Sequence, residues 1–79
     1  MGILFPGHVL ADRAPSPEER FRIETTLRNE GFTDWGKIEL DDEDDVWAID
    51  DAHAFDGQSY YLSLHPDTLA IIAREPHNE

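Results

Sequence analysis

The segment from Ser16 to Gly31 specifies both ends of a helix, and this constrains the fold more than any other feature of the chain. Ser16 is a favourable N-cap, because its hydroxyl accepts an otherwise unpaired backbone N–H of the first turn. Pro17 falls at the first helical position, and Glu19 completes a capping box. Gly31 suits the left-handed conformation that follows many helices, so we predict a helix over about residues 17–30. Its apolar stripe is formed by Phe21, Ile23 and Leu27.

After Gly31 the apolar pattern changes from a helical to an alternating period, which is typical of strands with one buried face. The predicted strands cover about residues 37–41, 46–55, 59–65 and 69–73. Short turns connect them, among them the two-residue hairpin signal Asp56-Gly57. The pair Asp50-Asp51 interrupts the alternation, so we expect a β-bulge there. The sequence therefore predicts an α+β fold in which the helix packs on a three- to four-stranded antiparallel sheet.

With 79 residues the chain is long enough for one domain, and we expect it to span residues 1–79. Residues 1–15 form an N-terminal segment that docks its apolar side chains as a tail or a short strand. Residues 75–79 form a polar tail. The N-terminal residues lack the basic start and the apolar stretch of about 7–15 residues that a secretory signal needs. Since no apolar run is long enough to cross a membrane either, we expect a cytoplasmic location.

The negative charge is concentrated in the second part of the chain. The formal net charge is −12, and residues 38–79 contain twelve Asp and Glu residues against one Arg. Such a surface repels phosphates, so we expect neither direct nucleic-acid binding nor binding to an anionic membrane. The densest cluster is the acidic patch of the predicted turn, which consists of Asp41, Asp42, Glu43, Asp44 and Asp45.

The sequence contains no recognisable pattern for enzyme chemistry. It has no Cys, and its four His residues are scattered without a metal-binding spacing. A calcium loop that started at Asp41 would need Gly at the sixth position and Glu at the twelfth, but Val46 and Ala52 stand there. No nucleophile motif or glycine-rich phosphate loop occurs. We therefore expect a protein without cofactor, metal or enzymatic activity.

The pattern of residues 16–74 resembles the PepSY-type domains. The matching pieces begin with a helix that ends in Gly31-Phe32 and continue with Ile38-Glu39-Leu40 and a strand with an aromatic residue at Trp47. They end with the Asp56-Gly57 hairpin, Tyr60-Tyr61-Leu62-Ser63-Leu64 and His65-Pro66-Asp67-Thr68-Leu69-Ala70-Ile71. The resemblance implies a small α+β domain without catalytic residues.

Two positions depart from the pattern of this family. His65 stands where the family often has Asp, and Leu69 stands where it has Gly. Because Leu is disfavoured at positive φ, we expect no left-handed conformation at Leu69. The family occurs in propeptides of secreted metalloproteases and in bacterial envelope proteins, where it is thought to inhibit peptidases or bind proteins. The resemblance thus implies a binding role, and we expect no protease to be attached.

These observations favour a small protein-interaction or regulatory module. Its partner would meet the uncovered sheet face or an edge strand, and the predicted contact residues are Trp47, Tyr61 and Ser63. An alternative is an acidic decoy that mimics nucleic acid, in which the patch Asp41–Asp45 binds a basic protein. A third possibility is a homodimer that buries the open sheet face to enlarge a small core.

Overall fold

A computed structural model describes residues 13–77 and contains one helix and five strands. The helix α1 spans Pro17–Asn29. The strands are β1 (Phe32–Asp34), β2 (Ile38–Asp41), β3 (Val46–Ala54), β4 (Ser59–Leu64) and β5 (Ile71–Pro76). The predicted docking of the apolar side chains of residues 1–12 lies outside the described residues. None of the described helices is long and apolar enough to cross a membrane.

The helix begins and ends close to where the sequence places its caps. The backbone N–H of Glu19 donates to Oγ of Ser16, and the backbone N–H of Ser16 donates to Oε1 of Glu19, so the predicted capping box is confirmed. Gly31 has a φ of 94°, as expected for the residue that ends a helix. Phe21 does not belong to the buried stripe, since it is 68% exposed while Ile23 and Leu27 are buried.

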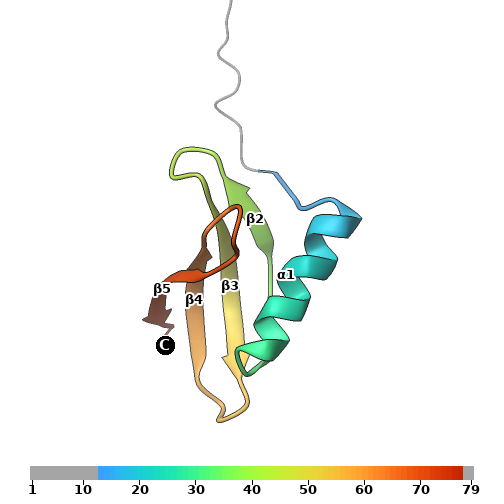
Figure 1. Ribbon diagram of the computed structural model, residues 1–79. Helices are drawn as coiled ribbons and strands as arrows, with labels where there is room; N and C mark the ends of the chain where they lie inside the picture. The colour runs from blue at the N-terminus through green and yellow to red at the C-terminus, as the bar shows by residue number, and fades with distance from the viewer. Residues whose placement is uncertain (1–12, 78–79) are drawn as a thin grey trace, which may run out of the picture.

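The five strands form one antiparallel sheet in the order β1-β3-β4-β5, and β2 also pairs with β3 (Figure 1). The fold class is therefore α+β, as predicted, with one strand more than expected. The additional strand, β1, has only three residues and follows the helix directly. The last predicted strand begins two residues later than expected, because residues 66–68 form a turn that Leu69 closes by donating its N–H to the carbonyl of His65.

Two irregularities shape the long hairpin of β3 and β4. The pairing register shifts between Ile49 and Ala52, and Asp51 there has a φ of 48°, so the predicted bulge is confirmed. The turn after β3 is longer than the predicted two-residue hairpin. Ala54 donates its N–H to the carbonyl of Gln58, which leaves three residues between them, and Gly57 takes the left-handed position with a φ of 93°.

The core lies between α1 and one face of the sheet. Figure 1 shows α1 next to β2 and β3, and the described residues contain no second helix that could cover the other face. The largest of the fully buried side chains are Ile23, Leu27, Ile38, Ile49, Leu62 and Leu64. We call the uncovered side the open face and define it by Glu39, Ala48, Tyr61, Ser63, Ala73 and Glu75.

Candidate functional site

The strand register decides which predicted contact residues reach the open face. Ala48 pairs with Ser63, and Ser63 pairs with Ala73, so these three side chains lie side by side on the open face. Trp47 pairs with Leu64, a core residue, and therefore faces the helix.

Trp47 is 3% exposed, and the guanidinium of Arg13 lies 5.4 Å from the centre of its ring. The prediction that Trp47 contacts a partner is therefore wrong, because the helix face already buries this side chain. The physical reason is the alternation of the strand: Trp47 and Ile49 lie on the same face, and Ile49 belongs to the core.

Tyr61 is the large aromatic side chain of the open face. It is 44% exposed and lies directly opposite Glu75 of the neighbouring strand β5. Its neighbour Tyr60 faces the helix instead, where its ring meets the edge of Phe32 at a centroid distance of 5.9 Å. Two adjacent tyrosines thus have different roles, one in the packed layer and one on the open face.

A hydrogen-bonded chain of three side chains holds Tyr61 in place. The ring of His77 stacks on the ring of Tyr61 at a centroid distance of 4.4 Å, and Nε2 of His77 lies 3.1 Å from the tyrosine hydroxyl. On its other side, Nδ1 of His77 lies 2.6 Å from Oδ1 of Asp51. The backbone N–H of His77 donates to the carbonyl of Ser59, which fixes the histidine beside β4.

The two contacts engage both ring nitrogens of His77. A carboxylate can only accept, so Nδ1–H of His77 is the donor in the contact with Asp51. In the neutral ring Nε2 is then an acceptor, and the hydroxyl of Tyr61 donates to it. The result is a tyrosine whose ring and hydroxyl both have a fixed orientation on a solvent-facing surface.

Sequence reasoning missed both His77 and Asp51. His77 falls in the segment predicted as a polar tail, and Asp51 is recognisable only as part of a bulge. The bulge turns the Asp51 side chain toward the open face, and the extra length of β5 brings His77 beside Tyr61. The bulge was predicted, but the contact between Asp51 and His77 has no local sequence signal, because it joins residues 26 positions apart.

The acidic patch forms the turn between β2 and β3. Asp41 uses its carboxylate to accept the backbone N–H groups of Glu43 and Asp44, at 3.0 and 3.3 Å. Asp45 has a φ of 56° and donates its N–H to the carbonyl of Asp41. Asp41 therefore has a structural role in the turn, whereas the four residues after it are exposed.

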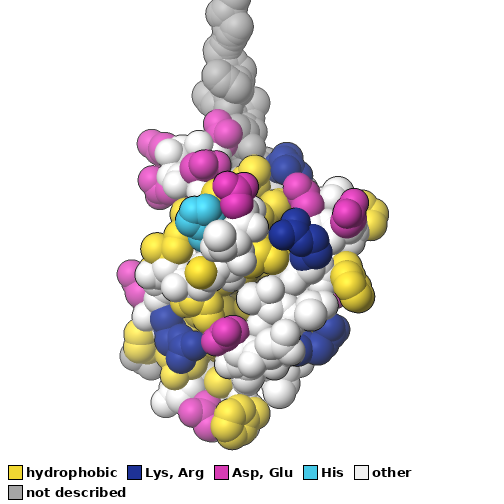
Figure 2. Space-filling model, in the orientation of Figure 1, with side chains coloured by type: hydrophobic (Ala, Val, Ile, Leu, Met, Phe, Trp, Pro, Cys, Tyr) yellow, Lys and Arg dark blue, Asp and Glu magenta, His cyan; other side chains and the backbone are white. Residues whose placement is uncertain are grey.

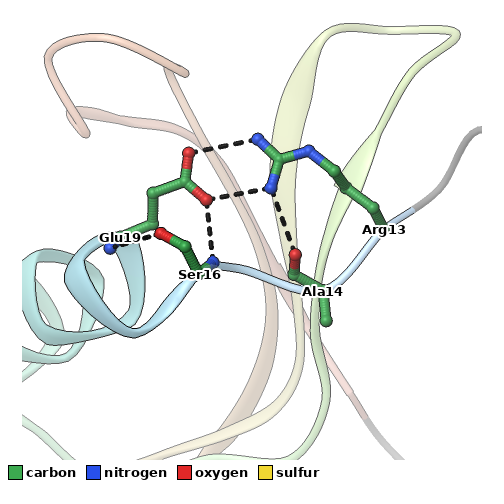
Figure 3. A network of polar contacts seen from close by, with 4 residues as sticks. All are labelled: Arg13, Ala14, Ser16 and Glu19. Carbon is green, nitrogen blue, oxygen red and sulfur yellow. Dashed lines mark hydrogen bonds and ion pairs between the residues drawn. The ribbon is translucent and has the colours of Figure 1, made fainter.

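A second polar network lies at the N-terminal end of the helix (Figure 3). Arg13 donates from both guanidinium nitrogens to the carboxylate of Glu19, at 2.9 and 3.1 Å. Its backbone also exchanges two hydrogen bonds with Leu40 of β2. The hydrogen bonds from Arg13 and from the N–H of Ser16 lower the pKa of Glu19 to about 2. This network joins the helix cap to an edge of the sheet, and we assign it a structural role.

The described residues contain no group of three or more metal-ligating side chains. Comparisons of the chain with protein-family models, with curated proteins and with solved structures find no match. The function is therefore argued from the geometry of the open face.

Proposed function

We propose that this protein is a small, non-enzymatic protein-binding module of PepSY-like type that holds its partner on the open face. The observation that carries the proposal is the side chain of Tyr61, which is 44% exposed yet fixed by His77 and Asp51. Tyrosine is common at protein interfaces because it offers a large contact area for a small loss of side-chain freedom. A tyrosine already held in place loses even less on binding.

The neighbouring side chains support the same proposal. Ala48, Ser63 and Ala73 are small and lie in register across three strands, so a partner backbone can approach this part of the sheet closely. Ser63 adds a hydroxyl that can donate or accept a hydrogen bond. Tyr61 and Ser63 therefore remain the proposed contact residues.

The test compares what folded variants capture from a lysate of the source cells. Tyr61→Ala removes the aromatic contact, and Phe21→Ala is the matched control, because Phe21 is an exposed aromatic residue on the helix. We expect a protein that is captured by the wild type and by Phe21→Ala but not by Tyr61→Ala. Equal capture by all three folded proteins would exclude Tyr61 as the contact.

A further inference from the structure

The cationic side chains are distributed unequally over the two sides of the molecule. The described residues contain five arginines, and each of them contacts the helix or the helix-facing side of the sheet. Figure 2 shows dark blue side chains beside exposed apolar side chains on this helix-bearing side. The open face contains no arginine. The single lysine, Lys37, lies 3.5 Å from the carboxylate of Glu39.

Most aromatic rings of the helix side have an arginine above them. The guanidinium of Arg13 lies over Trp47, that of Arg28 over Trp35, and that of Arg74 over Phe32 and Tyr60, each 5.4 Å from a ring centre. A guanidinium at this distance is attracted by the electron-rich face of the ring. This chain therefore repeatedly pairs an aromatic ring with an arginine.

Tyr61 differs from these rings because its partner is the imidazole of His77 and not an arginine, and because the other neighbouring side chains are acidic. Glu75 lies directly opposite on β5, and Asp51 is connected to Tyr61 through His77. Asp51 has 51% of its side chain exposed, so the carboxylate can also meet a group outside the protein. His77 lies between the ring and Asp51, so the exposed part of the ring and the neighbouring Glu75 form the site that complements a planar cation. No arginine is found over the Tyr61 ring in the described chain.

We propose that the open face binds an extended, arginine-bearing segment of the partner, with one guanidinium against the part of the Tyr61 ring that His77 leaves exposed and beside Glu75. This inference rests on the proposed function and names the chemistry of the partner. Arginine fits better than lysine, because its flat guanidinium both stacks on a ring and forms forked hydrogen bonds with carboxylates. In an extended segment alternate side chains point the same way, so arginines at every second position face the sheet together.

The probe is a blocked peptide of sequence Arg-Thr-Arg-Thr-Arg, added to the isotope-labelled full chain at physiological salt while backbone amide shifts are recorded by NMR. We expect saturable shifts at Tyr61, Ser63 and Glu75, and no such shifts with a peptide that has neutral citrulline in place of arginine. Loss of one exposed cation–π contact in Tyr61→Leu should weaken binding about two- to five-fold. Tyr61→Phe keeps the ring and should bind more tightly than Tyr61→Leu.

Glu75→Gln tests the same site by removing a carboxylate, while the aromatic ring of Tyr61 stays unchanged. We expect weaker binding of the arginine peptide and a smaller dependence on salt. Unchanged affinity in folded Tyr61→Leu, or shifts confined to the turn 42–45, would overturn the inference. If the natural partner still requires Tyr61 while the peptide fails to bind, the arginine inference falls and the proposed function stands. If the partner also binds independently of Tyr61, both are wrong.

Discussion

Nδ1 of His77 lies 2.6 Å from Oδ1 of Asp51, and this contact joins the end of β5 to the bulge of β3. Both residues flank β4, whose Tyr61 completes the chain of contacts. The open face is therefore organised by side chains from three strands.

The pair Asp51 and His77 should show energetic coupling. We expect Asp51→Asn and His77→Gln to destabilise the protein together by less than the sum of their separate effects. For a partly exposed pair of polar side chains the difference should be about 0.2–1 kcal/mol. Urea unfolding of the wild type, both single variants and the double variant measures it. Asp50→Asn is the control at the neighbouring exposed position, and additive effects of Asp51 and His77 would show that the contact has no energetic role.

At position 69 a glycine variant should be more stable than an alanine variant, which is the reverse of the usual order of stability. The structure gives Leu69 a φ of 64°, so the expectation that leucine would exclude the left-handed conformation is wrong. Burial compensates for the strain, because Leu69 is only 6% exposed. Leu69→Ala should cost about 2–5 kcal/mol, since it loses the burial and keeps the strain. Leu69→Gly loses the same burial but removes a strain of about 1–2 kcal/mol, so it should be the more stable variant.

Leu64 is the matched control for this comparison, because it is fully buried in β4 and has no positive φ. There alanine should be more stable than glycine. Thermal unfolding of the alanine and glycine variants shows which of the two is more stable at position 69 and which at position 64. The same order at both positions would contradict the account of Leu69.

Glu19 should make the helix cap sensitive to strong acid. Its pKa is lowered from 4.5 to about 2 by the hydrogen bonds from Arg13 and Ser16. Because the folded pKa lies below the unfolded value, ionised Glu19 stabilises the fold above pH 4.5. This contribution is lost as the pH falls from 4.5 through about 2.

Carbon-13 NMR of the Glu19 carboxyl group measures this titration directly. In Arg13→Gln the midpoint should rise toward 4.5. Arg20→Gln is the control, because Arg20 pairs with Glu24 instead. A midpoint near 2 that persists in Arg13→Gln would mean that Arg13 does not cause the low pKa.

Trp47 should matter for stability and not for partner contact. Trp47→Ala removes a core side chain and should cost about 3–5 kcal/mol, a large part of the stability of a small domain. Tyr61→Ala, on the open face, should cost about 1 kcal/mol or less. Denaturant unfolding measures the free energy of unfolding of Trp47→Ala and of Tyr61→Ala. Similar losses of stability would contradict the assignment of these residues to opposite faces.

Local sequence signals account for much of this fold. The capping box at Ser16, the left-handed Gly31 and the bulge at Asp51 each depend on residues close in sequence, and each was predictable. The positive φ at Leu69 was not, because it depends on burial by the rest of the fold. The short strand β1 was also missed, since three residues are too few to show a period.

The candidate site was only partly predictable for the same reason. Alternation along β4 places Tyr61 and Ser63 on the open face, but alternation also places Trp47 beside Ile49 in the core. The contacts of Tyr61 with His77 depend on strand pairing between β4 and β5 and therefore on the complete sheet.

The most direct test of the open face as the binding surface is photo-crosslinking from a single site. The chain contains no cysteine, so Ser63→Cys provides one attachment point for a crosslinker on the open face. Thr25→Cys provides the matched point on the exposed side of the helix. In source-cell lysate we expect a specific crosslinked product from position 63 that is absent from position 25 and lost when Tyr61→Ala is added. The same products from both positions, or a specific product from position 25 alone, would contradict binding on the open face.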